Sequence, residues 1–365
     1  MRKSDTTLEA RLPKALSRDL RNKIKFLIWR AGVGSLFKAV VARKRAFEHV
    51  FKRTPNSIMV FPTNLCNALC SFCAYPTNTD KKQMMANDTA FKVIDDFIAM
   101  GGGNVVDFTT NLGDPLVDPR LADKLAYAKA KGVKRTRFYT NGILLDRDGL
   151  IEKLMPNVDR LHISLPGLDR KNYFEVFKVD KAEKLLRGLL KLAEYKKATG
   201  FPKEVFLELR INRPFAIVMQ DDGMQKIKPY IKQGIFSFGV TIENYDNWGG
   251  TITKENMTGS MALRESRTSD HTVPCQLLFY NPGILPDGHV RACSCWYINT
   301  NYDKLTLEKV TDKPLSEILF GDGHRAIISD WIKGELPPPC PKCSNYEPAF
   351  FSLKDTVRMA SALFS

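Results

Sequence analysis

Long apolar runs are missing from this sequence. Its most apolar stretch, residues 26–42, is interrupted by Arg30 and Lys38 and is shorter than the roughly 20 residues needed to cross a bilayer. The first 20 residues are polar and charged, and they lack the apolar core of a signal peptide. No internal repeat stands out. These absences argue against a membrane-spanning or secreted protein and predict a cytoplasmic one.

Cysteine and histidine are scarce, with 8 and 5 residues among 365. So few cysteines exclude a small scaffold built from disulfides, and a chain of this length can bury a core without them. The composition, 44% hydrophobic and 26% charged, is that of an ordinary globular protein, and the length predicts about two domains. Because the cysteines are clustered, with none between Cys73 and Cys275, they indicate metal binding in a reducing compartment.

Acidic residues are outnumbered by basic ones, 40 against 55, which leaves a net charge of +15. This excess predicts an anionic partner, either a phosphorylated or nucleotide-linked sugar as small-molecule substrate or an anionic surface. Lys and Arg are scattered and form no nucleic-acid motif with aromatic residues, so we do not expect nucleic acid as a partner. Residues 1–55 are predicted to be helical. Basic and aromatic residues interleave over residues 17–46, so this segment either packs on the main domain or makes a peripheral membrane contact with anionic lipid.

Short β-rich runs alternate with helical stretches from residue 56 to about 250. This alternation predicts an α/β fold of parallel βαβ units, arranged as a doubly wound sheet or as a partial (β/α)6 barrel. A doubly wound sheet would be apolar on both faces, whereas His162, Ser164, Glu208 and Arg210 give two of these strands a polar side, which favours the barrel. The predicted strands are 58–62, 104–110, 135–140, 158–164, 204–212 and 235–242, and the predicted helices are 88–101, 119–131, 146–155, 181–198 and 221–233.

The alternation stops after residue 250. Residues 251–272 are polar and aperiodic, which is typical of a connector. Residues 275–297 are predicted to form a β-hairpin around Pro286-Asp287-Gly288, followed by a helix near residues 314–333. The segment 273–350 is therefore predicted to be a small C-terminal extension, and residues 351–365 a tail.

Cys66, Cys70 and Cys73 form the motif C-x3-C-x2-C directly after the first predicted strand. Three thiolates on one loop can bind three irons of a 4Fe–4S cluster and leave the fourth iron open to another ligand. A zinc site is the alternative, although structural zinc sites take four ligands. The motif therefore predicts an iron–sulfur cluster that can do chemistry on a bound molecule.

This spacing, its place after a strand and the motifs that follow resemble the radical SAM superfamily over residues 56–250. The resemblance implies that S-adenosylmethionine (SAM) binds the open iron. Gly113-Asp114-Pro115 is similar to the family's GGEP motif, which meets the SAM amino group, with Asp in place of Glu. These motifs follow predicted strands at their C-terminal ends, where barrels place active sites. The implied cofactor-binding residues are Phe72, Gly113, Asp114, Pro115, Asn141, Ser164 and Arg210.

The remaining cysteines include a second set of four metal ligands, Cys275, Cys293, Cys340 and Cys343. Four thiols in two pairs suffice for a closed 4Fe–4S cluster or for a zinc ribbon. The spacing C-x12-G-x4-C that begins at Cys275 resembles the SPASM and twitch extensions of radical SAM enzymes. No cysteine follows Cys343, as in the single-cluster twitch form. The resemblance implies a second, auxiliary 4Fe–4S cluster.

Cys295 is left over, two residues after Cys293. A free cysteine is most often a small buried hydrophobe. The functional alternatives are a substitute cluster ligand and, as in epimerases resembling this class, a hydrogen-atom donor that quenches a substrate radical.

The resemblance implies an enzyme that reductively cleaves SAM to a 5′-deoxyadenosyl radical, which abstracts a substrate hydrogen. With the auxiliary cluster as electron acceptor, the simplest outcome is oxidation, or epimerisation, of a sugar- or aminocyclitol-like alcohol, by analogy with a twitch dehydrogenase. The base candidates are His162, Glu208 and Glu243. An electron donor such as flavodoxin or ferredoxin would reduce the first cluster. The alternatives are a radical SAM maturase acting on a peptide or protein, and a non-catalytic Fe–S protein that senses redox state or binds RNA.

Overall fold

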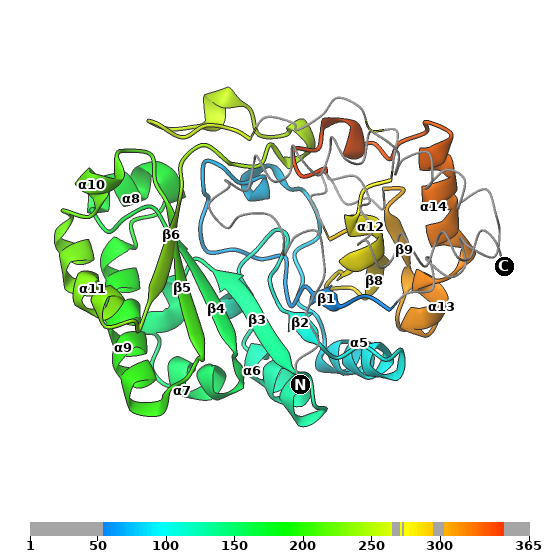
Figure 1. Ribbon diagram of the computed structural model, residues 1–365, viewed down its shortest axis with the longest axis horizontal. Coiled ribbons are helices and arrows are strands. Elements are labelled where there is room, and N and C mark those ends of the chain that lie inside the picture. The colour runs from blue at the N-terminus through cyan, green and yellow to red at the C-terminus, as the bar shows by residue number, and fades with distance from the viewer. Residues whose placement is uncertain (1–53, 265–270, 272–273, 295–302, 347–365) are drawn as a thin grey trace, which may run out of the picture.

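The computed structural model describes residues 54–264, 271, 274–294 and 303–346 of the chain (Figure 1). Most of the predicted helical segment 1–55 lies outside the described residues, as do Cys295 and the predicted tail 351–365. Among the described residues, no helix has the length and apolar character needed to cross a membrane.

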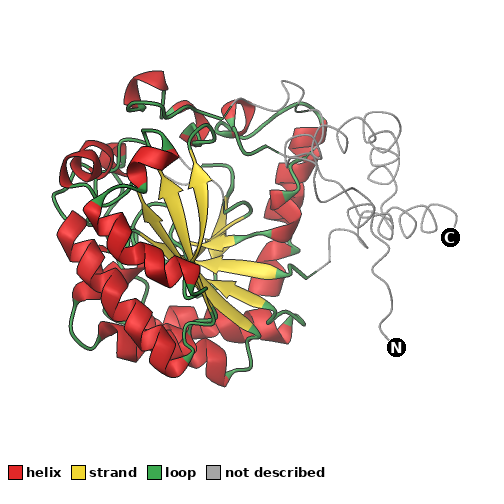
Figure 2. Cartoon of the chain, turned by 60° about the vertical axis from the view of Figure 1, so that its left-hand side comes forward, coloured by secondary structure: helices red, strands yellow, loops and turns green. Residues whose placement is uncertain are grey.

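One sheet of nine strands runs through the described structure, in the order β6-β5-β4-β3-β2-β1-β7-β8-β9 (Figures 1 and 2). All neighbouring strands from β1 to β6 are parallel, with helices between them along the chain. This mixed α/β fold with a parallel core confirms the predicted partial barrel. The parallel strands are β1 Ser57–Val60, β2 Val105–Asp107, β3 Arg135–Thr140, β4 Arg160–Leu165, β5 Glu204–Arg210 and β6 Ser237–Thr241.

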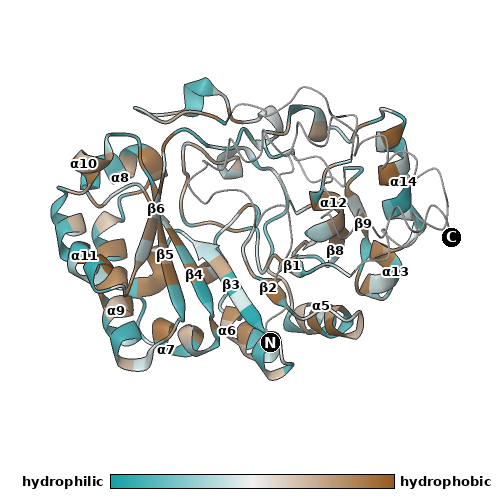
Figure 3. Cartoon of the chain, in the orientation of Figure 1, coloured by the Kyte–Doolittle hydropathy of each residue, from teal (hydrophilic) through white to brown (hydrophobic). Residues whose placement is uncertain are grey.

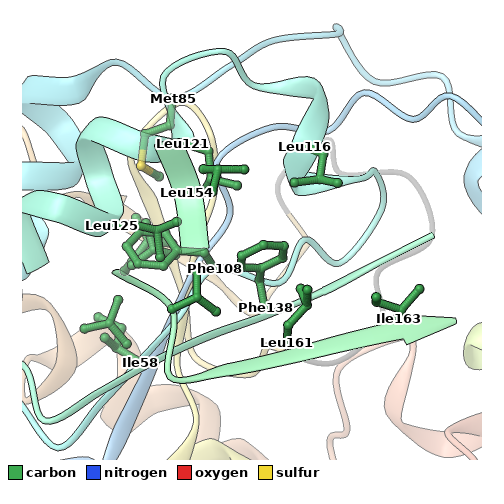
Figure 4. Packing of buried hydrophobic residues seen from close by; sticks show 14 of the residues in the cluster. Ile58, Met85, Phe108, Leu116, Leu121, Leu125, Phe138, Leu154, Leu161 and Ile163 are labelled. Carbon is green, nitrogen blue, oxygen red and sulfur yellow. The ribbon is translucent and has the colours of Figure 1, made fainter. Parts of the chain in front are cut away.

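Helices cover the outer face of the parallel strands (Figure 2). Apolar side chains fill the space between the two layers: Phe138 and Leu161 of the sheet and Leu125 of a covering helix are fully buried (Figure 4). The same helices turn polar residues to the outside, so apolar and polar positions are mixed along each of them (Figure 3). The helices are α5 Asn87–Ala99, α6 Leu121–Ala130, α7 Leu150–Leu154, α8 Arg170–Phe177, α9 Ala182–Thr199, α10 Phe215–Val218 and α11 Asp222–Lys232.

The inner face of the parallel strands is more polar and less tightly covered. Along β5, Leu207 and Leu209 are fully buried, whereas Glu208 and Arg210 are only partly buried. Because side chains alternate across a strand, the two polar residues face away from the helices and into the barrel. This alternation, visible in the sequence, decides which residues line the interior.

Several elements differ from the sequence-based prediction, among them α10, which was not predicted, and Leu277–Tyr280, which is helical within the predicted hairpin. Helix α8 was not predicted, because its eight residues are too few to show helical periodicity. The predicted helix 314–333 is two helices, α13 Leu315–Leu319 and α14 Asp322–Ile332, separated at Gly321, whose backbone is extended. The last parallel strand ends at Thr241, so the base candidate Glu243 lies beyond it in an exposed bend.

The predicted hairpin adds to the barrel sheet at its β1 edge. Strand β7 Gly283–Ile284 pairs in parallel with β1, and β8 His289–Arg291 and β9 Thr306–Lys309 follow in antiparallel pairing. The short helix α12 Leu277–Tyr280 precedes β7. Gly288 takes the left-handed conformation that the turn requires, with φ of 90°. One sheet thus passes from the barrel segment 56–250 into the extension 273–350, and these domain boundaries stay predictions.

Candidate functional site

The first cysteine motif lies on the loop that leaves β1, and helix α8 anchors this loop. The backbone N–H of Leu69 donates to the Phe177 carbonyl at 3.1 Å, and that of Ser71 donates to the Val176 carbonyl at 2.9 Å. Both acceptors lie at the end of α8, where carbonyls have no partner within the helix. The three thiols on this anchored loop, Cys66, Cys70 and Cys73, are partly buried and form no disulfide.

Burial disfavours ionisation of these thiols. It raises the pKa of Cys66 to about 12 and that of Cys73 to about 11, and it raises the pKa of Cys70 well above its ordinary value. At Cys66 and Cys70 nearby thiolates raise the pKa further, whereas the positive charge of Arg210 lowers the pKa of Cys70 and Cys73. Three thiolates at this site therefore need a cation to compensate their charge, as iron would.

Two N–H donors face the sulfurs, as is common around iron–sulfur clusters. The amide Nδ2 of Asn141 lies 3.9 Å from Cys66 Sγ, and the backbone N of Tyr75 lies 3.4 Å from Cys73 Sγ. Within the described ranges, no three His, Cys, Asp or Glu side chains are placed to hold a single metal ion. A four-iron cluster spreads its ligands more widely, because each cysteine binds a different iron. The donor set of soft thiols and N–H groups fits such a cluster.

The Gly113-Asp114-Pro115 segment after β2 lies directly against the cysteine loop. The Asp114 N–H donates to the Leu65 carbonyl at 2.8 Å. Gly113 has φ of 134°, and a Cβ there would lie 2.8 Å from the same carbonyl, so only glycine allows this approach. The Asp114 carboxylate is buried and points inward, accepting hydrogen bonds from the Leu116 and Asn141 N–H groups and from the Thr140 hydroxyl.

Asp114 thus joins the ends of β2 and β3 through its side chain, and its contact with a cofactor stays a prediction. Burial raises the pKa of Asp114 to about 6, although its hydrogen bonds to Asn141, Thr140 and Leu116 oppose the rise. The carboxylate is therefore ionised at pH 7 and serves both backbone N–H donors at once.

Replacing Asp114 by asparagine is expected to destabilise the fold. The amide has one accepting oxygen, so either the Leu116 or the Asn141 N–H would face an NH2 group and stay unsatisfied in a buried site. Such a loss costs about 1–3 kcal/mol of unfolding free energy. Denaturant unfolding of the metal-free chain at pH 7 measures this change in unfolding free energy. Asp148→Asn is the control, because the Asp148 side chain is fully exposed; equal stability of Asp114→Asn and wild type would contradict the prediction.

A group of aromatic and charged residues surrounds the cysteine loop on its barrel side. The Arg210 guanidinium lies 5.2 Å from the centre of the Phe72 ring and 6.0 Å from that of Tyr245. Its Nη2 atom lies 3.2 Å from the Glu208 carboxylate, which also accepts a hydrogen bond from the Thr241 hydroxyl at 3.1 Å. The structure therefore brings Phe72 of the cysteine loop together with Glu208 and Arg210 of β5, which lie more than 130 residues away in the sequence.

His162 lies one layer deeper in the barrel. In the sheet register it stands between Tyr139 and Phe206, and its ring stacks on Tyr139 at 4.0 Å between centres. Burial lowers the pKa of His162 to about 4, and the positive charges of Arg160 and Arg137 lower it further, against the opposing effect of Glu208. The imidazole is therefore neutral at pH 7. Its Nδ1 atom is buried and has no hydrogen-bond partner among the described residues.

The other predicted residues of the barrel lie at different levels. Ser164 pairs in register with Glu208, two residues above His162 along β4. Pro115 is buried at the start of the short 3-10 helix Pro115–Val117. Glu243 is exposed in the bend after β6 and is not brought to the other base candidates by any described contact. The structure thus groups His162 and Glu208 inside the barrel and leaves Glu243 outside it.

The second set of cysteines lines one cavity at the C-terminal extension. Cys275 precedes α12, Cys293 follows β8, and Cys340 and Cys343 flank a turn of 3-10 helix. Burial raises the pKa of Cys340, and Cys293, Cys343 and Cys275 raise it further through their charges, so all four thiols lie near one another. Burial also raises the pKa of Cys343 to about 12. The lining residues are Gly249, Cys275, Leu277, Leu278, Cys293, Leu305, Trp331, Pro339, Cys340, Cys343 and Tyr346.

The walls of this cavity include residues that the sequence analysis missed. Trp331 and Tyr346 stack with ring centres 6.0 Å apart and close its apolar side. No sequence motif links these two aromatic residues to the cysteines, so they could not be predicted as part of the site. Tyr139 was also missed, although it is a partly buried position between two buried ones along β3 and pairs in register with His162. Four thiols in an apolar cavity fit a closed iron–sulfur cluster.

Residues 60–205 match the family model of the Radical SAM superfamily. The chain is 30% identical over 148 residues to GTP 3',8-cyclase of Chlorobaculum tepidum. The match covers 39% of this chain and 42% of that protein. It is 27% identical over 149 residues to a probable GTP 3',8-cyclase of Methanococcus maripaludis. That match covers 40% of this chain and 48% of that protein. The matched part thus spans less than half the length of these curated relatives.

Two solved structures share the fold. The crystal structure of BtrN in complex with AdoMet and 2-DOIA superposes with a TM-score of 0.51 and 13% identity, covering 82% of this chain and 99% of that one. SuiB of Streptococcus suis, bound to its precursor peptide SuiA, gives a TM-score of 0.57 and 15% identity, covering 84% and 75%. At these identities the likeness concerns the architecture.

Proposed function

We propose that this chain, whose residues 60–205 form a radical SAM domain, oxidises a sugar- or aminocyclitol-like alcohol and passes the remaining electron to an auxiliary 4Fe–4S cluster. The observation that carries the proposal is the gathering of Cys275, Cys293, Cys340 and Cys343 around one cavity, in addition to the separate three-cysteine loop at the barrel. Three thiols suit a cluster open to SAM, and four suit a closed cluster that only accepts or gives an electron.

When bound, the first cluster and SAM would supply reductive cleavage of the sulfonium and a 5′-deoxyadenosyl radical that abstracts hydrogen. The chain's own part is placement. Cys66, Cys70 and Cys73 would hold the iron, and the N–H groups of Asn141 and Tyr75 face the sulfurs. Phe72 covers one side of the loop, where the stacked Arg210 guanidinium supplies positive charge for a carboxylate.

Oxidation of an alcohol to a carbonyl removes one hydrogen atom from carbon, one proton from oxygen and one electron. The proton needs an acceptor inside the barrel. Glu208 is paired with Arg210 and Thr241, whereas His162 is neutral and no residue in the described part of the chain bonds its Nδ1. We therefore assign proton acceptance to His162, with Tyr139 and Phe206 on either side of its ring excluding water.

A phosphorylated or nucleotide-like substrate is the second candidate. The net charge of +15 favours an anionic ligand, and the curated relatives that match about 40% of the chain are named GTP 3',8-cyclase or probable GTP 3',8-cyclase. In that case the reaction would rearrange the substrate, with no net oxidation. Both candidates need a one-electron donor such as flavodoxin or ferredoxin for the first cluster.

Anaerobic reconstitution with iron and sulfide, followed by SAM and dithionite, tests the proposal. We expect about eight irons per chain, since each 4Fe–4S cluster holds four, and release of 5′-deoxyadenosine. A panel of aminocyclitols, sugars and their phosphates, compared with GTP, then separates the two candidates by product. A chain with its full iron content and no 5′-deoxyadenosine would overturn the radical chemistry altogether.

Replacing His162 by phenylalanine is expected to lower substrate oxidation by about 100-fold or more, the scale of a lost general base, while SAM cleavage without substrate continues. The ring would still stack on Tyr139. Product formation and 5′-deoxyadenosine release, measured together, separate the two effects. Equal loss of both would contradict the role.

The His162→Phe variant also tests how the unfolding free energy depends on pH. The folded pKa of His162, about 4, lies below the usual value near 6.5, so only the unfolded chain takes up a proton between these pH values. Wild-type stability should therefore fall as the pH drops from about 6.5 to about 4, and His162→Phe should remove that part of the slope.

A further inference from the structure

Trp248, in the segment after β6, contacts the first cysteine loop. Its indole Nε1–H donates to the Phe72 carbonyl at 2.9 Å, and Phe72 lies between Cys70 and Cys73 in the chain. The indole is 6% exposed and packs in a small apolar cluster with Phe61 and Leu112. The hydrogen bond is therefore buried and fixes the peptide that carries two of the three thiols.

Asn247, the preceding residue, contacts the second cysteine set. Its Nδ2 donates to the Lys342 carbonyl at 2.7 Å, its backbone N–H donates to the Ser344 hydroxyl at 3.1 Å, and its Oδ1 accepts from the Ser344 N–H at 3.3 Å. Lys342 and Ser344 stand on either side of Cys343. One asparagine thus holds the backbone before and after a thiol of the second cavity.

The backbone between these contacts is unusual. Trp248 has φ of 50°, a left-handed conformation that a bulky residue rarely adopts, and Gly249 and Gly250 follow with φ of 62° and 96°. Such strain persists only where the surroundings determine it. Gly249 also lines the second cavity, and a Cβ on Gly250 would lie 3.1 Å from Lys342 Cδ. The turn therefore lies close to the loop that carries Cys340 and Cys343.

We infer that residues 247–249 are a positioning element that fixes the two cysteine sets relative to each other. Trp248 holds one set and Asn247 the other, and a single peptide bond joins them, so a displacement at one contact is transmitted to the other. The assignment of a cluster to each set rests on the proposed function, but the contacts belong to the chain itself. Transfer of an electron between two clusters would depend on the separation that this element maintains.

The test uses the full-length chain, stripped of metal by a chelator and kept reduced. Each thiol's rate of alkylation by iodoacetamide, read by mass spectrometry, reports its local opening. Trp248→Phe keeps an aromatic ring and removes the indole N–H. We expect faster alkylation of Cys70 and Cys73 and also of Cys340 and Cys343, by about tenfold, which corresponds to about 1.4 kcal/mol.

Trp331→Phe is the matched control. Its indole N–H donates to the His271 carbonyl at 2.6 Å, and its ring lines the second cavity, whereas the hydrogen bond to the first loop comes from Trp248. It should raise alkylation of Cys340 and Cys343 and leave Cys66, Cys70 and Cys73 unchanged. A global loss of stability would instead raise the alkylation rate of every thiol in both variants.

Asn247→Ser provides the reciprocal test and serves in place of Trp248→Phe if that variant does not fold. It should raise alkylation of Cys70 and Cys73 as well as of Cys343. An increase confined to the set next to the substituted residue, in either variant, would overturn the inference. Because alkylation needs neither iron nor SAM, a chain that fails to cleave SAM would refute the proposed function and leave this result standing.

Discussion

Replacing Cys70 by alanine is expected to abolish SAM cleavage and to remove about four irons per chain. Cys70 is partly buried on a loop anchored to α8, and both neighbouring cysteines of the motif act on it electrostatically. With two thiols left, the site has too few ligands to retain a cluster and no open iron for SAM. The loss should exceed the roughly 100-fold effect of removing a hydrogen-bond partner of a ligand. Iron content, EPR after reduction and 5′-deoxyadenosine release measure it.

Ser71→Ala is the control for this experiment. Ser71 is adjacent to Cys70, and its buried hydroxyl oxygen bonds no other residue that the structure describes, so its removal leaves none of these groups unsatisfied. We expect wild-type iron content and SAM cleavage. Normal 5′-deoxyadenosine release by Cys70→Ala would show that SAM is cleaved elsewhere and would refute the assignment of the first loop.

Replacing Cys343 by alanine is expected to separate the two clusters functionally. The iron content should fall by about four, because Cys343 is one of four thiols around the second cavity. SAM cleavage should remain within a few-fold of wild type, since the first loop keeps all three thiols. Substrate oxidation should be lost, because the electron left after hydrogen abstraction would have no acceptor. The measurements are iron content, 5′-deoxyadenosine and oxidised product in the same reaction.

Cys295→Ala provides a thiol control for this variant. Cys295 lies outside the described residues, and its three predicted roles remain open. Unchanged iron content and turnover would eliminate both the ligand and the hydrogen-donor roles. A Cys343→Ala chain that keeps eight irons, or that oxidises substrate at the wild-type rate, would refute the auxiliary cluster as electron acceptor.

The sequence predicted the fold where local patterns repeat. Six strands with helices between them, one polar strand face and a turn at Gly288 follow from alternation and turn chemistry, and all are present. Helix α8 could not be predicted, because eight residues show too little periodicity. Its C-terminal carbonyls nevertheless anchor the first cysteine loop, which only a contact between distant segments could reveal.

The base candidates show the same limit. His162 and Glu208 were identified because alternation along a strand determines which side chains face inward. Glu243 lies beyond β6, because the strand ends at Thr241 and strand ends depend on pairing with a neighbour, and its role as a base stays a prediction. The sequence also gave no reason to prefer His162 over Glu208, since only packing shows that Arg210 and Thr241 already occupy the Glu208 carboxylate.

The eight cysteines show most clearly what the sequence determines and what only the tertiary structure decides. Their types and spacing determined by themselves that three thiols share one loop and that four others form two pairs, because ligand chemistry depends on residue type and on short chain distances. Only the tertiary structure decided that the four thiols line one apolar cavity, and that Asn247 and Trp248 join it to the first loop. Those contacts link segments about 95 and 176 residues apart, and packing of the whole sheet, not local sequence, brings such segments together.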